Sequence, residues 1–151
     1  MRATEHLPAG ILAGFVYAAT RPGQTDDYGS LVEWITGAVG GGFGGLVPDL
    51  LEPATNPWHR SMAHSLFAGG GIVALDTQLT RWQSKLREKA LEYRECRAKA
   101  PEGIQRFILL LGELLCFALA GLIAGVLAGY VSHLVLDAIT PASLPVLMKG
   151  F

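Results

Sequence analysis

One nearly unbroken apolar stretch, residues 106–128, constrains the fold of this chain most; it reads RFILLLGELLCFALAGLIAGVLA. About 20 apolar residues are enough to cross the roughly 30 Å of hydrocarbon in a bilayer, so the stretch predicts a transmembrane helix. We expect the helix to continue to the Thr140-Pro141 pair, where proline stops it. Glycine recurs every fourth residue along one face, a spacing that lets helix backbones approach closely in lipid; the residues are Gly121, Gly125 and Gly129.

Three further apolar segments precede this stretch, at residues 4–20, 31–48 and about 61–79. Residues 77–100 are strongly charged but carry apolar side chains three and four positions apart, which predicts an amphipathic basic helix between the third and fourth spans. The sequence therefore predicts an all-α fold in a single membrane-embedded domain, residues 1–151. This domain would be a multi-pass transmembrane helical bundle of about four spans plus one amphipathic charged helix.

Composition agrees with a membrane protein. Half of the 151 residues are hydrophobic and 17% are charged, against about 25% in soluble domains. The net charge of −1 gives no reason to expect a nucleic-acid partner, whereas the apolar segments imply contact with membrane lipid. Cys96 and Cys116 form no CxxC motif, so a thiolate metal site is not expected.

Six residues of metal-ligating types interrupt or flank the apolar segments: His6, Asp49, His59, His64, His133 and Asp137. If four segments cross the membrane in alternation, the starts of odd spans and the ends of even spans lie on the same side. All six residues would then converge on one face of the membrane. Imidazole and carboxylate are ligands that zinc and related ions accept, so the sequence predicts a divalent-metal site, with zinc favoured and manganese as the alternative.

The distribution of basic residues predicts on which side of the membrane the metal site lies. Eight of the twelve Lys and Arg residues fall between residues 81 and 106, and an excess of basic residues marks the cytoplasmic face. The predicted metal site lies at the opposite ends of the spans, and therefore toward the outer leaflet.

Other polar residues have more than one interpretation. His133 and Asp137 are four residues apart on one helix face, so both could bind the ion, or the carboxylate could orient the imidazole. The two candidate catalytic residues are Arg60 and Glu52. Arg60 could hold a substrate phosphate, and it could equally pair with Glu52. Glu113 lies twenty residues before His133, about 30 Å along a helix, so we expect a structural role for it near the basic segment.

The order of these motifs resembles the membrane-bound, metal-dependent hydrolases of the bacterial inner membrane, the YdjM-like family. The matching residues are Thr4–His6, Pro48-Asp49, His59-Arg60 with Ala63-His64-Ser65, and Gly129-Tyr130 through Ser132-His133 and Asp137 to Thr140-Pro141. The chain departs from the family pattern at Leu51, where a second Asp is usual, and at Ala63, where Thr is usual.

The resemblance implies a protein of the bacterial inner membrane with hydrolase activity. With the distribution of basic residues, we expect a multi-pass protein whose site lies on the periplasmic side. The mechanism that we expect is attack of metal-activated water on a phosphoester, and a lipid or lipid-linked substrate follows from the membrane location alone. Two non-enzymatic alternatives stay open. The ion could clip the helices of a membrane scaffold together, or the chain could be an effector subunit that acts through its basic helix.

Overall fold

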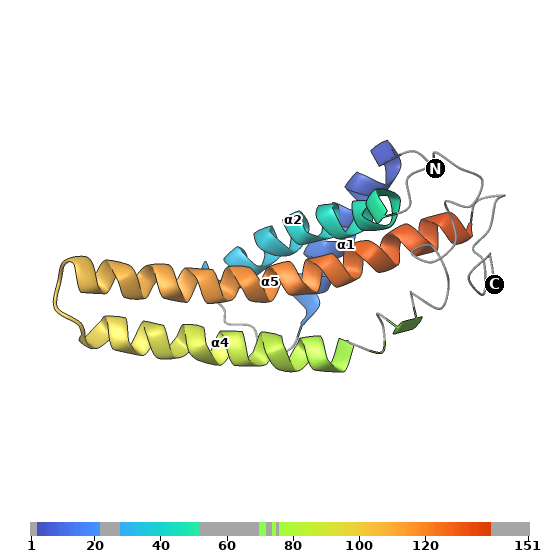
Figure 1. The fold of residues 1–151 in the computed structure, drawn as a ribbon. Coiled ribbons are helices and arrows are strands. Elements are labelled where there is room, and N and C mark those ends of the chain that lie inside the picture. The colour runs from blue at the N-terminus through green and yellow to red at the C-terminus, as the bar shows by residue number, and fades with distance from the viewer. Residues whose placement is uncertain (1–2, 22–27, 52–69, 72–73, 75, 140–151) are drawn as a thin grey trace.

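The computed structural model describes residues 3–21, 28–51, 70–71, 74 and 76–139. Within these ranges the main elements are all helices and there is no strand, which confirms the predicted all-α fold: α1 (Ala3–Thr20), α2 (Tyr28–Leu51), α4 (Asp76–Lys99) and α5 (Ile104–Ala138). Figure 1 shows α5 running through the molecule, with α1 and α2 packed toward one end of it and α4 alongside the other.

Helix α5 is the axis of the bundle. Its 35 residues extend about 52 Å at 1.5 Å per residue, and its composition is apolar enough to cross a membrane. It ends at Ala138, just before the Thr140-Pro141 pair, as predicted. Among the described helices α5 alone combines spanning length with this apolar composition, and the apolar helix His6–Thr20 is shorter. The total of about four spans stays a prediction.

Helix α2 contacts its neighbours backbone to backbone. A Cβ atom on Gly41 would overlap the carbonyl oxygen of Gly10 in α1. A Cβ atom on Gly129 in α5 would overlap the carbonyl oxygen of Gly41 and lie 2.7 Å from its carbonyl carbon. One turn earlier, Gly125 meets Gly37 in the same way, so α2 and α5 run parallel. The glycine repeats therefore act as the close-approach surfaces that their spacing predicts.

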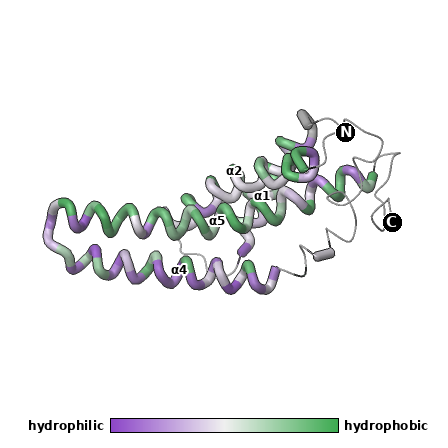
Figure 2. Tube along the Cα trace, in the orientation of Figure 1, coloured by the Kyte–Doolittle hydropathy of each residue, from purple (hydrophilic) through white to green (hydrophobic). Residues whose placement is uncertain are grey.

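Helix α4 runs back along the first half of α5 and carries much of the charge. Figure 2 shows the contrast between a largely hydrophilic α4 and a largely hydrophobic α5. The side-chain amide of Gln83 donates a 3.1 Å hydrogen bond to the carbonyl oxygen of Ala120. Further along, the ring of Tyr93 lies against Gly112. The helix predicted at residues 77–100 is thus present, and it packs against the bundle.

A buried ion pair joins α4 to α2. Arg87 Nε donates to Glu33 Oε1 at 2.8 Å, and Arg87 Nη2 donates to Glu33 Oε2 at 2.6 Å. Both side chains are buried, so the two-bond geometry compensates part of the cost of removing each charge from water. The pair fixes the distance and the rotation of α4 relative to α2.

Glu113 has the structural role that the sequence predicts. Its fully buried carboxylate accepts hydrogen bonds from three side chains: Tyr28, Arg94 and Arg97. The last two are on α4 and the first begins α2, so one buried anion ties three helices together. Twenty residues, about 30 Å, separate it along α5 from His133.

The third apolar segment was expected to extend to about Leu79, and the last residues of that range belong to α4, which is described from Asp76. The carboxylate of Asp76 accepts hydrogen bonds from Tyr17 and Arg21 at the end of α1, which holds the start of α4 in place. The expected segment otherwise lies mostly outside the described residues.

The glycine contacts predict that replacing glycine by alanine destabilises the protein at some positions and not at others. Gly129→Ala would force α2 and α5 apart, and we expect it to lower the free energy of unfolding by about 1–3 kcal/mol. Gly70→Ala is the control, because a Cβ there meets no atom within 4 Å in the described structure. Thermal unfolding of the two variants in detergent tests this, and equal melting temperatures would contradict it.

The buried ion pair predicts strong coupling between its partners. Glu33→Met and Arg87→Met should each cost about 3–5 kcal/mol, because each leaves an uncompensated buried charge. The double variant should cost clearly less than the sum of the two. Lys89→Met, which breaks an exposed Lys89–Glu92 pair on the same helix, is the control and should change stability little. Additive effects of the two buried substitutions would refute the coupling.

Candidate metal centre

Four residues from three helices meet at one end of the bundle. His6 lies in the first turns of α1, Asp49 near the end of α2, and His133 and Asp137 in the last turns of α5. We call these four residues the His–Asp cluster. Figure 1 shows the ends of α2 and α5 on the same side of the molecule as the N-terminus. The alternating topology inferred from the sequence predicts this convergence.

Asp137 faces the Nε2 atoms of both imidazoles. Its Oδ1 is 3.6 Å from Nε2 of His6, and its Oδ2 is 3.6 Å from Nε2 of His133. Asp49 Oδ1 approaches the same His133 nitrogen from α2, at 3.8 Å. The two imidazole rings stack with their centroids 3.8 Å apart and an interplanar angle of 20°. Ring nitrogens and carboxylate oxygens therefore converge on one small volume.

The tautomer of His133 follows from its other ring nitrogen. Nδ1 lies 2.6 Å from the carbonyl oxygen of Gly45, and a carbonyl oxygen only accepts hydrogen bonds. Nδ1 must therefore carry the proton and donate it. In the neutral ring the lone pair is then on Nε2, the atom that faces Asp49 and Asp137. A carbonyl behind the imidazole is the arrangement by which proteins orient a metal-ligating histidine.

Gly45 makes this geometry possible. A Cβ atom at this position would lie 3.0 Å from the carbonyl oxygen of His6 and 3.3 Å from Cα of Gly10, so the absence of a side chain at residue 45 lets α1 pack closely against α2. The same close packing lets the imidazole of His133 reach the Gly45 carbonyl. The local fold therefore depends on the glycine spacing of α2 as much as on the ligating residues.

The distances in the His–Asp cluster fit a shared cation. Separations of 3.6–3.8 Å are too long for hydrogen bonds. Two ligands of one tetrahedral zinc ion, at about 2.0–2.2 Å from the metal, lie about 3.3 Å from each other. One ligand atom each from His6, His133 and Asp137 falls within 4.8 Å of the other two, and all three side chains are buried. The donor set and its spacing suit a divalent metal.

Among the four residues of the cluster, Asp49 is the most exposed. The side chain of Asp49 is 37% exposed, whereas those of Asp137 and both histidines are at most 1% exposed. Solvent can therefore approach from the end of α2. A catalytic metal site keeps a coordination position open to water or substrate, and this is the side on which such a position would lie.

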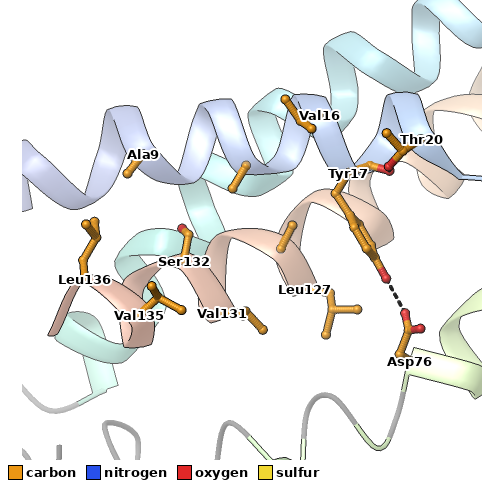
Figure 3. Close-up of a pocket in the computed structure, with 12 residues that line it drawn as sticks. Ala9, Val16, Tyr17, Thr20, Asp76, Leu127, Val131, Ser132, Val135 and Leu136 are labelled. Atoms are coloured by element: carbon orange, nitrogen blue, oxygen red, sulfur yellow. Dashed lines mark hydrogen bonds between the residues drawn. The ribbon is translucent and has the colours of Figure 1, made fainter. Parts of the chain in front are cut away.

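A groove of about 650 Å³ runs between α1 and the second half of α5 (Figure 3). Its walls are mainly apolar side chains of the two helices. Two lining residues, Ser132 and Leu136, directly precede the α5 members of the His–Asp cluster in the chain, so the groove adjoins the site. At its other end the hydroxyl of Tyr17 donates a hydrogen bond to Asp76 (Figure 3).

The remaining candidates from the sequence lie outside the described residues. These are Glu52, His59, Arg60 and His64. Their roles as catalytic residues or ligands stay predictions. Sequence reasoning did not identify the Gly45 carbonyl as the partner of His133. The glycine repeats of the two helices were visible, but their relative register, which decides this contact, was not.

One described helix, α5, is long and apolar enough to cross a membrane, and ionisable residues buried in such a helix mark a candidate functional site. The chain belongs to the YdjM inner membrane protein family, whose model matches residues 1–148. It is therefore an inner-membrane protein of the family that its motifs resemble. Searches with the chain match no curated protein and no solved structure.

The geometry predicts that the chain binds metal through α1 and α5 together. His133→Ala should lower the metal content of detergent-purified protein strongly, and His6→Ala likewise, because each removes one of three buried ligands. Ser132→Ala is the matched control; its hydroxyl donates within α5 to the carbonyl of Gly129 at 2.8 Å and faces the groove. Elemental analysis after dialysis against zinc or manganese measures the effect. Unchanged metal content in both histidine variants would show that the cluster is not the metal site.

Proposed function

We propose that the chain is a membrane-bound, metal-dependent hydrolase that acts on a phosphoester. The observation that carries the proposal is the buried His133 imidazole, whose proton is held by the Gly45 carbonyl and whose lone pair faces two carboxylates. In a neutral ring with its proton on Nδ1, the Nε2 lone pair would face carboxylate oxygens, and a cation between these atoms would relieve their repulsion. The family membership is compatible with the membrane location that we propose for this activity, because the family consists of inner membrane proteins.

In this proposal His6, His133 and Asp137 hold the ion from the buried side, and Asp49 completes the ligand set from the exposed side. When bound, the ion supplies Lewis acidity, which makes water nucleophilic near neutral pH and polarises a phosphoryl oxygen. Stacking fixes the orientation of the two imidazoles relative to each other. Asp137 faces one ring with each of its carboxylate oxygens and would hold the ion together with both rings. The remaining candidates, Arg60 and Glu52, would hold the substrate phosphate and assist proton transfer.

A lipid or lipid-linked phosphoester is the substrate class that we favour. The apolar groove between α1 and α5 adjoins the His–Asp cluster and lies within the part of α5 that suits a bilayer. An apolar chain in this groove would place an attached headgroup near the end of the bundle where the cluster lies. A water-soluble phosphoester would gain nothing from such a groove.

The exposed side of the cluster favours an enzyme over a scaffold in which the ion only clips helices together. A structural zinc site has four protein ligands and is closed, whereas the cluster is accessible to solvent at Asp49. The basic-helix effector alternative finds less support, because many of the polar side chains of α4 are engaged within the bundle, as in the Glu33–Arg87 pair.

The activity can be tested with purified protein and a chromogenic phosphodiester. We expect hydrolysis that a chelator abolishes and that zinc or manganese restores, and a loss of about 100-fold or more in His133→Ala. Ser132→Ala should retain both metal and activity towards this small substrate. Metal binding without any hydrolysis of chromogenic or lipid-linked phosphoesters would favour the scaffold. Hydrolysis that survives in His133→Ala would place the chemistry elsewhere.

A further inference from the structure

An open cavity of about 470 Å³ lies at the turn between α4 and α5. Charged and apolar side chains line it together: Arg97, Glu102, Gly103, Arg106, Phe107 and Leu110. Figure 1 shows this turn at the end of the molecule away from the N-terminus. Along α5, Arg106 is about 40 Å from His133, so the cavity is separate from the His–Asp cluster.

Arg97 is held in position by the buried carboxylate of Glu113. Its Nε donates to Glu113 Oε2 at 3.1 Å, and its Nη2 donates to the hydroxyl of Tyr28 at 2.8 Å. A guanidinium group has five N–H donors, so these bonds leave the donors of Nη1 for another acceptor. Because Arg94 also binds Glu113, two positive charges face one negative charge here, and a positive charge remains.

Arg106 is the more accessible of the two arginines in the cavity. Its side chain is 46% exposed, and its Nη1 lies 3.7 Å from Oε1 of Glu102, which is too long for a hydrogen bond. Glu102 is itself 93% exposed, so water screens this pair and the pair contributes little. Gly103, the N-cap residue of α5, has no side chain to cap the first N–H groups, so the helix dipole adds to the positive charge. The cavity therefore presents one guanidinium group from each helix to an anion.

The apolar part of the cavity continues into an exposed apolar surface of α5. Phe107 lines the cavity, and its side chain is exposed together with those of Ile104, Ile108 and Leu111. The transmembrane span predicted from the sequence begins at residue 106, so this surface would face lipid, and the cavity would lie where headgroups meet hydrocarbon. The basic residues place this end of the span on the cytoplasmic side. A molecule that joins a phosphate to an acyl chain matches this order of charged and apolar groups.

We propose that the cavity binds the headgroup of an anionic phospholipid. Arg106 and the remaining donors of Arg97 bind the phosphate, as guanidinium groups in basic pockets on the cytoplasmic side of membrane proteins do. Phe107 and Leu110 contact the upper part of an acyl chain. A zwitterionic headgroup would bring an ammonium group to the same two arginines, so we expect it to bind more weakly. An acidic peptide would satisfy the arginines but leave the apolar side chains without a partner.

Lipid binding to the detergent-purified full chain tests the proposal. Native mass spectrometry should show phosphatidylglycerol bound in preference to phosphatidylcholine. Arg106→Gln should lower the affinity for phosphatidylglycerol about tenfold, because it removes a charge-assisted contact, whereas Arg106→Lys should retain much of the binding. Arg81→Gln is the matched control: it removes an exposed arginine about 24 Å along α4 from Arg97 and should leave binding unchanged. Equal binding of the two lipids, or equal effects of Arg106→Gln and Arg81→Gln, would overturn the proposal.

Soluble competitors separate a phospholipid from other anions. Glycerol 3-phosphate and inorganic phosphate should not displace phosphatidylglycerol at equal concentration, because they lack the chain that contacts Phe107 and Leu110. If either displaces the lipid, the cavity is a site for a free phosphate group and the proposal is wrong. Displacement by a glutamate-rich peptide would assign the cavity to an acidic protein segment and would refute the proposal as well.

Discussion

Direct contact between helix backbones, without side chains between them, determines how this bundle is assembled. Gly41 touches α1 on one side and α5 on the other. A Cβ atom on Gly41 would overlap the carbonyl oxygen of Gly10, and a Cβ atom on Gly129 would overlap the carbonyl oxygen of Gly41. Backbone contacts this close fix the axial register of one helix relative to the next as well as the distance between the helix axes, because neighbouring carbonyl groups would collide at other registers. The position of α2 along α5 in turn decides which carbonyl oxygen His133 meets. The chemistry at the end of the bundle therefore depends on glycines in its middle.

In the part of the chain that the structure describes, buried polar side chains gather in two places of opposite character, and Glu113 in one of them is about 30 Å along α5 from His133 in the other. Around Glu33 and Glu113, arginine side chains neutralise each carboxylate and supply most of its hydrogen bonds. That cluster is complete with the residues of the chain and serves to attach α4. The His–Asp cluster instead sets imidazole nitrogens against carboxylate oxygens at distances that are too long for hydrogen bonds. The first arrangement stabilises a fold, whereas the second suits a bound cation.

Much of this architecture could be predicted from the sequence, and the failures have a common cause. The length and end of α5, the charged helix at 77–100 and the structural role of Glu113 follow from local composition and spacing. The meeting of His6, Asp49, His133 and Asp137 follows from counting helix ends. Contacts that depend on the register between helices could not be predicted, such as the bond from His133 to Gly45 and the stacking of the two imidazoles. The contacts of Asp76 with Tyr17 and Arg21 of α1 are a further example, since they join residues more than fifty positions apart.

The members of the His–Asp cluster come from both ends of the chain. His6 lies in α1 and Asp137 in the last turn of α5, so the cluster can form only after both helices have been synthesised and inserted. A chain that ends before the last turns of α5 would hold at most a fragment of the cluster. If the cluster binds a cation as proposed, a loaded site would identify chains in which α1 and α5 have packed together.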